Sequence, residues 1–596
     1  MDATDVMRVR DTCNVWVLRR GRDGVCIDFG SGAVLDRLDE LGLDRVTDVL
    51  LTHHHRDQAQ GLGRALEAGA RVWVPPVEQE LFTRATAFWE QRRLDDTYET
   101  RQEALSLLES VPVTGAVDEY RMRAYGGVEV YTLPTPGHTV GSVTYLVEVD
   151  GEQVAFTGDL LYGPGQVWSL AATQWTYGGT EGLAASLLSC ELLARRGVAR
   201  LLPAHGEPME EPARALAATQ ERLAELMELR RVETAPFDYR RWVERPWREI
   251  SPHVLLNTTS ISNAYALLSD SGAALLLDWG YDLWTGWPLG GPRHANRPLL
   301  ASVEALFRDH GVQRVDALLT THYHDDHVAG ANLLRDVHGA EVWSPENVAP
   351  ILESPERYDL PCLWFDPVPV DRVLPFGEPV EWHEHRLTLH PLPGHTRYAA
   401  AVEFEADGTR YLATGDQQTH QADGRLIANY QYRNRFAIDD YVRSAELYER
   451  LRPDVLLTGH WTAHELDPAA LAAHAADAAR IAELHRGLLP VEDAEGVYAR
   501  IVPYRSTVAA GGTLELAVEV RNPFADARRA TVALVLPEGW RAEPARHEVE
   551  LAPGEERSVA FSVSAGGGSR RVPVAVDLTL GDTPLGRHAE ALVTVR

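Results

Sequence analysis

The segment THYHDDH at residues 321–327 gathers three histidines and two aspartates into seven positions. Imidazole nitrogens and carboxylate oxygens are the usual protein ligands of zinc. A strand-like apolar run precedes the segment, so alternation places His322 and His324 on the same side of the chain. Asp326 and His327 then begin the next helix and face a second cation about 3.5–4 Å from the first. The spacing predicts a site for two metal ions.

The chain carries a second copy of this motif. Residues 52–58 have the sequence THHHRDQ and also follow an apolar run. Each copy is followed, in the same order, by a Gly-His pair, a Gly-Asp pair and a last histidine, which are His138, Asp159 and His205 in the first copy and His395, Asp416 and His460 in the second. The aspartate follows the first of these histidines by 21 residues in both copies. The last histidine follows the aspartate by 46 residues in the first copy and by 44 in the second. This repetition predicts two copies of one fold.

Together these motifs resemble the metallo-β-lactamase superfamily, present twice, over roughly residues 8–230 and 252–486. The resemblance implies, for the second copy, a first metal held by His322, His324 and His395, a second held by Asp326, His327 and His460, and Asp416 bridging both. In the first copy the same roles fall to His53, His55 and His138, then to Asp57, Gln58 and His205, with Asp159 as the bridge. Gln58 departs from the pattern, because a neutral amide is a poorer zinc ligand than imidazole.

The resemblance implies zinc as the cofactor, with two ions in the second copy and one or two in the first. Iron and manganese accept the same imidazole and carboxylate donors, so the donors leave the metal open. Bound zinc lowers the pKa of a coordinated water toward about 7, which makes hydroxide available as the nucleophile. Asp326 and Asp416 are therefore expected to act in catalysis as well as in metal binding. Aspartate at the bridge resembles the glyoxalase II, lactonase and phosphodiesterase branches, and it disfavours a β-lactam substrate.

Two further side chains are candidates for contact with substrate. Tyr162 lies three residues after Asp159, a placement that resembles the carbonyl-polarising tyrosine of some lactonases, although a half-buried structural role fits equally well. Arg397 lies two residues after His395. A guanidinium beside the metals favours an anionic small-molecule substrate such as a carboxylate or a phosphate, and a solvated rim residue is the alternative.

The elements that must position these residues alternate along both copies. Strand-like runs are interleaved with helical patterns over residues 182–196, 212–231 and 468–488, which predicts two α/β domains with mixed sheets covered by helices. The resemblance implies that each domain is an αββα sandwich. In the second copy an insertion at 281–297 is rich in tryptophan and glycine and is predicted to form an aromatic lid over the site. In the first copy an added helical stretch, 79–110, is predicted to form either packing filler or a wall of the cleft.

The remaining segments differ in character from the two copies. Residues 236–251 are rich in arginine and aromatic side chains and are predicted to form a packed linker. From residue 489 onward, short alternating strands broken by Gly and Pro predict an all-β sandwich that resembles immunoglobulin-like modules. The domain scheme is therefore 1–235, 236–251, 252–488 and 489–596.

The composition of the chain limits the kinds of partner that it is expected to bind. The 596 residues include 57 basic and 87 acidic side chains, a formal net charge of −30, which argues against nucleic acid as the main partner. No apolar run is long enough to span a membrane, and the N-terminal residues lack a signal pattern, so a cytoplasmic location is expected. The sequence leaves a homo-oligomer open.

The sequence thus predicts a bacterial, zinc-dependent hydrolase whose main active site lies in the second copy. A metal-bound hydroxide would attack an ester, a lactone or a thioester. The first alternative is a phosphodiesterase with the same two-metal site. The second alternative is a non-catalytic binding or assembly protein that metals stabilise.

Overall fold

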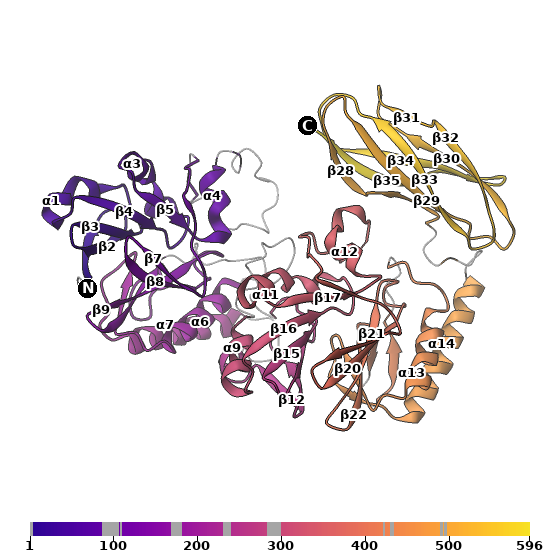
Figure 1. Cartoon of the computed structure of the whole chain (residues 1–596), viewed down its shortest axis with the longest axis horizontal. Coiled ribbons are helices and arrows are strands. Elements are labelled where there is room, and N and C mark those ends of the chain that lie inside the picture. Colours follow the sequence, from indigo (N-terminus) through magenta and orange to yellow (C-terminus); the bar gives the residue numbers. More distant parts are fainter. Residues whose placement is uncertain are drawn as a thin grey trace. The chain divides into compact units, whose positions relative to one another are not determined.

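The computed structural model describes residues 4–85, 87, 106–107, 110–168, 181–230, 240–282, 300–360, 362–420, 424–429, 434–488, 493 and 497–596. The chain divides into two compact units, whose helices and strands are labelled in Figure 1. The first comprises Met1–Arg248, Thr258–Ser260 and Tyr281–Gly311, and the second comprises Glu249–Asn257, Ile261–Gly280 and Val312–Arg596. The four segments predicted from the sequence are finer than this division and stay a prediction.

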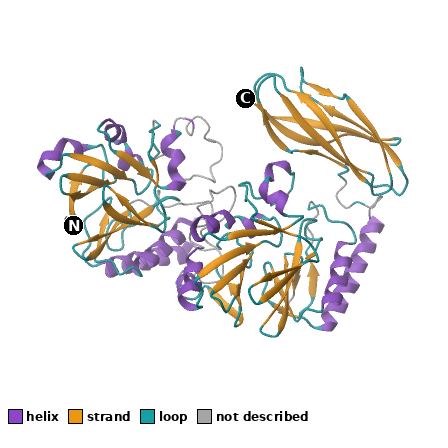
Figure 2. Cartoon of the chain, viewed as in Figure 1, coloured by secondary structure: helices purple, strands orange, loops and turns teal. Residues whose placement is uncertain are grey.

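Two β-sheets form the centre of the first unit (Figure 2). The first sheet has the order β1 (Asp5–Arg10), β2 (Asn14–Arg20), β3 (Asp23–Ile27), β4 (Arg45–Leu50), β5 (Arg71–Val74) and β6 (Gly115–Ala116). The second has the order β11 (Arg200–Pro203), β10 (Glu152–Gly158), β9 (Val143–Val149), β8 (Val128–Pro134) and β7 (Met122–Tyr125). The helices of this unit are α1 (Leu38–Leu41), α2 (Arg56–Ala59), α3 (Leu62–Glu67), α4 (Gln79–Thr83), α6 (Glu181–Ala194), α7 (Pro212–Arg230), α8 (Arg241–Glu244) and α9 (Ala301–Asp309).

Strand β2 shows why these layers form. Its side chains alternate between two cores, as the period of two in a strand requires. Val15 and Val17 pack with Leu62 of α3, on the helix-covered face of the first sheet. Trp16 and Leu18 face the other way and pack with residues of β8, β9 and β10 in the second sheet. The outer face of the second sheet packs against α6 and α7. The first unit therefore has the predicted αββα layering.

The second unit repeats this plan and adds a β-rich region. One sheet has the order β12 (Trp247–Ser251), β13 (Val254–Asn257), β14 (Tyr265–Leu268), β15 (Ala273–Leu277), β16 (Arg314–Leu319), β17 (Glu341–Pro345) and β18 (Arg372–Leu374). Its partner has the order β19 (Pro379–Trp382), β20 (His385–Pro391), β21 (Ala400–Ala406), β22 (Thr409–Gly415), β25 (Val455–Thr458) and β26 (His464–Glu465), and β23 (Gln418–His420) pairs with β24 (Leu426–Ala428). The helices are α10 (Asp325–Val328), α11 (Ala331–His338), α12 (Ala349–Glu353), α13 (Asp440–Leu451) and α14 (Pro468–Leu488).

Buried side chains again join the two sheets of this plan. Leu275 and Leu319 of the first sheet share a core with Leu389 and Val402 of the second. The other face of the second sheet packs against α13 through Tyr448. Three helices expected from periodicity, at 182–196, 212–231 and 468–488, are confirmed as α6, α7 and α14 within two residues at each end.

The C-terminal region consists of strands in two sheets. The orders are β27 (Ala499–Val502), β29 (Thr513–Arg521), β33 (Glu556–Ser564), β31 (Arg541–Glu543) and β28 (Arg505–Val508), β35 (Thr583–Val595), β34 (Ser569–Leu580), β30 (Arg528–Val535), β32 (Arg546–Leu551). Alternate residues such as Val518 and Phe561 in one sheet pack against Val532 and Val574 in the other. The predicted all-β region is therefore present, and its immunoglobulin-like character stays a prediction.

Several predicted features fall largely outside the described residues. These are the lid at 281–297 beyond residue 282, the added stretch at 79–110 beyond α4, and the linker up to residue 239. In the described part of the linker, Trp247 is buried and its indole N–H donates to the carbonyl of Ser302 at 2.6 Å. None of the helices in the described ranges has the length and apolar character needed to cross a membrane.

Candidate metal centre

The loop that carries the first histidines of the second unit is fixed by a buried aspartate. Strand β16 ends at Leu319, and α10 begins at Asp325. Between them, the backbone N–H and the hydroxyl of Thr321 both donate to Asp278 at 2.7 Å. Asp278 directly follows β15, the strand that pairs with β16 in parallel. The sheet register therefore positions the histidine loop.

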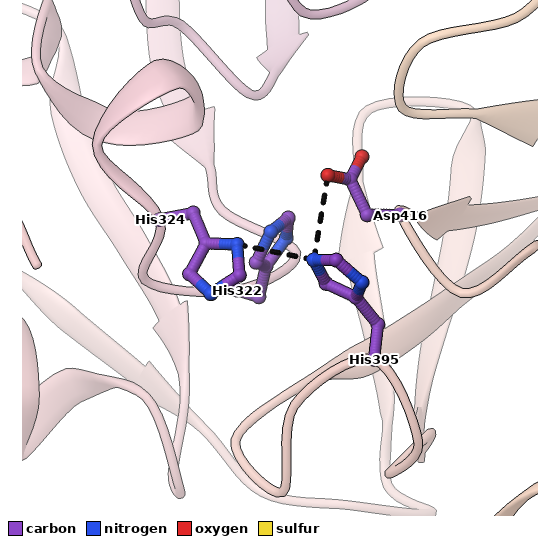
Figure 3. A group of neighbouring side chains, drawn as sticks. All are labelled: His322, His324, His395 and Asp416. Atoms are coloured by element: carbon purple, nitrogen blue, oxygen red, sulfur yellow. Dashed lines mark hydrogen bonds and ion pairs between the residues drawn. The ribbon is translucent and has the colours of Figure 1, made fainter. Parts of the chain in front are cut away.

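Four buried side chains meet beyond this loop, namely His322, His324, His395 and Asp416 (Figure 3). One ligand atom of each lies within 4.8 Å of those of the others. His395 Nε2 lies 3.2 Å from His324 Nδ1 and 3.6 Å from an oxygen of Asp416. Three imidazoles and one carboxylate that converge in this way form a donor group typical of zinc.

A second group shares Asp416 with the first. It comprises Asp326, His327, Asp416 and His460, again with ligand atoms within 4.8 Å of one another. His460 Nε2 lies 3.0 Å from Asp326 Oδ2 and 3.1 Å from Asp416 Oδ2. His327 Nε2 lies 3.2 Å from the other oxygen, Asp416 Oδ1. Asp416 is thus the one residue common to both groups, which is the geometry expected of a bridging ligand.

Outer contacts orient these imidazoles through their remaining nitrogens. His327 Nδ1 lies 2.8 Å from Asp278, and His395 Nδ1 lies 3.0 Å from the carbonyl of Asn429. His460 Nδ1 lies 3.3 Å from the carbonyl of Ile261. A carboxylate or carbonyl on the far nitrogen fixes the tautomer of a metal-binding histidine and raises its basicity.

The histidines of the two ligand groups differ in protonation because their surroundings differ. Burial lowers the pKa of His322, lowers that of His324 to about 3, and lowers that of His395, so these imidazoles are neutral at pH 7. Burial also opposes the charged form of His460, but hydrogen bonds to Asp326 and Asp416 raise its pKa to about 10. Neutral imidazole is the form that binds a metal ion.

The donors of the second unit fit a pair of divalent cations. His322 Nε2 is buried and has no hydrogen-bond partner among the described residues. An unpaired buried polar atom costs about 1–3 kcal/mol. A cation among His322, His324, His395 and Asp416 would satisfy that nitrogen, and the carboxylates of the neighbouring group would offset the charge of a second cation.

The first unit holds the corresponding residues in two smaller groups. His53, His55 and His138 form one group, and Asp57, Asp159 and His205 form another. The side-chain amide N–H of Gln58 donates to Asp159 at 3.1 Å. Asp159 also faces the three histidines, since its Oδ2 lies 3.6 Å from His53 Nε2 and 3.4 Å from His138 Nε2. The sequence thus brings the seven positions of each copy near one another.

The two candidate substrate contacts occupy different surroundings. Tyr162 is 37% exposed and stacks against Trp168, whose ring lies parallel to that of His205 with centroids 4.0 Å apart. The guanidinium of Arg397 lies 3.6 Å from Glu556, and its backbone N–H donates to the carbonyl of Asn434 at 2.9 Å. Their roles toward a substrate stay predictions.

Sequence reasoning missed the roles of Asp278, Asn434 and Trp168. Asp278 stands in an Asp-Trp-Gly turn that parallels Asp28-Phe29-Gly30 in the first copy, so the duplication itself held the signal. The amide nitrogen of Asn434 lies 3.1 Å from His324 Nε2. Asn434 and Trp168 lie between the aligned motifs, where no pattern singles them out.

Comparison with known proteins places these features in a family. The family model of the Metallo-beta-lactamase superfamily matches residues 8–205 and 259–460. A hydroxyacylglutathione hydrolase of Methylobacillus flagellatus is 29% identical over 221 residues, which cover 33% of this chain and 75% of that protein. A hydroxyacylglutathione hydrolase of Albidiferax ferrireducens is 28% identical over 154 residues, covering 25% of this chain and 48% of that protein. An uncharacterised protein of Mycobacterium tuberculosis is 28% identical over 208 residues, which cover 33% of this chain and 86% of that protein.

Two solved structures illustrate the structural neighbours. A metallo-β-lactamase of Cronobacter sakazakii is 20% identical, with coverage of 42% of this chain and 97% of that chain and a TM-score of 0.31. A metallo-β-lactamase family protein of Thermus thermophilus is 22% identical, with coverage of 38% of this chain and 81% of that chain and a TM-score of 0.29. The two spans matched by the family model include all fourteen candidate ligand positions. The chain therefore belongs to the metallo-β-lactamase superfamily, which it matches twice along its length.

Proposed function

We propose that this protein is a zinc-dependent hydrolase that cleaves an ester, a lactone or a thioester in its second unit. The observation that supports this most directly is the membership of Asp416 in two adjacent ligand groups. Paired cations bridged by a carboxylate are suited to hydrolysis, whereas structural zinc sites are usually closed, four-coordinate and single. The relatives named hydroxyacylglutathione hydrolase favour a thioester within this class.

Bound cations would supply a nucleophilic water at neutral pH and an electrophile for the oxyanion that develops in the transition state. The side chains of the chain itself set the geometry. Asp416 would hold the two positions close together, since its Oδ2 lies 3.6 Å from His395 of the first group and 3.1 Å from His460 of the second. Asp278 would keep the Nε2 lone pair of His327 directed inward by accepting the proton on Nδ1.

The test compares the wild-type chain with Asp416→Ala and His322→Ala on four substrates. These are an aryl acetate, a γ-lactone, an S-acyl glutathione thioester and an aryl phosphodiester. We expect turnover of at least one of the first three and a loss of about 100-fold or more in kcat/KM in both variants. Circular dichroism and metal analysis of each variant separate a lost site from a lost fold.

A matched control is His383→Ala. His383 is also a histidine of the second unit, but it pairs with Asp316 at 2.8 Å and belongs to neither ligand group. Its activity should equal that of the wild type. Turnover of the phosphodiester alone would replace this proposal with a phosphodiesterase. Absence of turnover on all four substrates in a chain loaded with zinc, iron or manganese would favour a binding protein.

A further inference from the structure

Gln58 of the first unit and His327 of the second unit occupy equivalent positions in the repeated fold. Helices α2 and α10 both begin after an extended histidine, with φ and ψ of −60° and 146° at His55 and −60° and 143° at His324. The carbonyl of Gln58 accepts the backbone N–H of Phe29 at 3.0 Å, and that of His327 accepts the N–H of Trp279 at 2.7 Å. The two side chains therefore start from equivalent backbone positions.

Gln58 uses that position to hold Asp159. The side chain of Gln58 is fully buried, and its Nε2 donates to Asp159 Oδ2 at 3.1 Å. The other oxygen, Asp159 Oδ1, lies 2.8 Å from His205 Nδ1. Gln58 Oε1 has no hydrogen-bond partner within the described part of the chain. Both oxygens of Asp159 thus face hydrogen-bond donors.

The chemistry of the donor decides whether a metal ion can replace this contact. An imidazole nitrogen that gives up its proton becomes a lone-pair donor, as His327 and His460 can beside Asp416. The nitrogen of a primary amide carries two protons and no available lone pair, so it donates hydrogen bonds only. Gln58 therefore holds Asp159 Oδ2 with a nitrogen that cannot itself bind a metal ion, and this nitrogen stands where His327 presents a ligand atom in the second unit.

A second difference acts in the same direction. Ala204 precedes His205, and Gly459 precedes His460. The two are equivalent in the fold, because Ala204 N–H donates to the carbonyl of Gly158 at 2.8 Å and Gly459 N–H donates to that of Gly415 at 2.7 Å. A Cβ at Gly459 would lie 1.9 Å from Asp416 Oδ1. The methyl group of Ala204 thus occupies the space that the corresponding oxygen needs in the second unit.

We propose that the first unit binds a single metal ion, through His53, His55 and His138, and that Gln58 and Ala204 close its second metal position. The three histidines form a buried ligand group, and Asp159 Oδ2 lies beside it, 3.6 Å from His53 Nε2 and 3.4 Å from His138 Nε2. Three histidines with an open fourth position are a known arrangement for one divalent cation. The inference rests on the metal binding of the proposed function and is independent of its hydrolytic activity.

The first unit keeps Asp28, the carboxylate that corresponds to Asp278 beside the second metal position. Asp28 accepts the backbone N–H and the hydroxyl of Thr52, both at 2.9 Å, as Asp278 does from Thr321. A histidine at position 58 would find in Asp28 the partner that His327 finds in Asp278. The double substitution Gln58→His/Ala204→Gly should therefore reopen the second position of the first unit.

The test is the number of metal ions per full-length chain, by elemental analysis after loading with zinc and removal of excess metal. We expect about three ions in the wild type, two in the second unit and one in the first. The variant Gln58→His/Ala204→Gly should hold about four, and His53→Ala about two. The reciprocal variant His327→Gln should hold about two, because an amide would then cap Asp416.

The matched control is Gln60→His/Ala204→Gly, which adds a histidine at an exposed position two residues further along. It should stay at about three ions. A wild type with four ions, or a Gln58→His/Ala204→Gly variant that is folded and stays at three, would overturn the inference. If that variant does not fold, His327→Gln decides, because retention of three ions there contradicts the role of the amide. Hydrolysis assays report on the proposed function separately, since an inactive chain with three ions leaves this inference intact.

Discussion

His327 Nδ1 lies 2.8 Å from Asp278 Oδ2, and the same carboxylate accepts two hydrogen bonds from Thr321. One buried aspartate at the end of β15 therefore fixes both the loop that carries His322 and His324 and the imidazole of the second ligand group. The first unit keeps the equivalent aspartate, Asp28, with the same two hydrogen bonds from Thr52 but with Gln58 in place of the histidine. The two carboxylates have the same neighbours in the backbone and different partners, so the same substitution should have different effects.

Asp278→Asn should lower the affinity of the second unit for its metal ions by about 10–100-fold, the usual effect of removing an outer carboxylate. Asparagine can still accept from Thr321, so the loop should keep its conformation. Competition with a chromophoric chelator measures the affinity. Asp316→Asn is the control, because Asp316 pairs with His383 outside both ligand groups. Equal affinities in the two variants would contradict this role.

Asp28→Asn should stabilise the metal-free protein, and more so at pH 8 than at pH 5. Burial raises the pKa of Asp28 to about 8, although hydrogen bonds from Thr52 lower it. Because the folded pKa exceeds the ordinary value of 3.8, Asp28 contributes stability below about pH 4 that is lost as the pH rises to about 8. Asparagine does not titrate and avoids this loss.

The melting temperature of the two chains at both pH values measures this effect. Each kcal/mol should shift Tm by about 2–4 °C in a domain of 150–250 residues. A Tm difference between Asp28→Asn and the wild type that does not grow from pH 5 to pH 8 would contradict the expected titration. Asp278→Asn in the same experiment should show no such gain, since its carboxylate is used by His327.

The contrast between these aspartates also shows what the sequence could and could not predict. The order and spacing of the histidine and aspartate motifs were sufficient to predict two copies of one fold, and their resemblance to the metallo-β-lactamase superfamily implied the αββα layering. The partnership of Asp278 with His327 spans 49 residues and exists only once β15 and β16 pair in register. The hydrogen bond from Gln58 to Asp159 joins residues that are 101 positions apart, so spacing within a motif cannot indicate it.

Trp168 and Ala204 mark a second limit of sequence reasoning. Trp168 lies against His205 through a loop that α7 anchors, since Gly165 N–H donates to Thr219 and Arg222 donates to the carbonyl of Gly165. Nothing in the local sequence of that loop indicates the contact. Ala204 differs from Gly459 by one methyl group, and the effect of that methyl becomes apparent only from the place that a Cβ at Gly459 would take beside Asp416.

Gly459→Ala should remove metal from the second unit without a large change in secondary structure. The added Cβ would lie 1.9 Å from Asp416 Oδ1 and 3.0 Å from His327 Cε1, so Asp416 must leave its shared position. We expect a loss of at least one ion per chain and of about 100-fold in kcat/KM. Gly63→Ala is the control, because a Cβ there meets nothing within 4 Å. Full metal content in Gly459→Ala would show that Asp416 does not need this space.

Metal binding should release histidine protons from the second unit and none from the first. In the metal-free chain, burial disfavours the charged forms of His327 and His460, but nearby carboxylates outweigh it and raise the pKa of His327 well above its usual value and that of His460 to about 10. Both imidazoles are protonated at pH 7 and must lose a proton to bind a cation, so affinity should rise with pH up to about 10. Burial lowers the pKa of His53 and His138, which therefore have no proton to release.

Titration calorimetry in two buffers of different ionisation enthalpy counts these protons at pH 7. His53→Ala reports the second unit, where we expect about two protons released for the pair of ions. His322→Ala/Asp416→Ala reports the first unit, where we expect about none. His205 makes this comparison decisive, because burial opposes its charged form but hydrogen bonds to Asp159 and Asp57 raise its pKa to about 10. A proton that the first unit releases, and that a His205→Gln variant does not release, would show that His205 binds metal and that Gln58 does not close the second position.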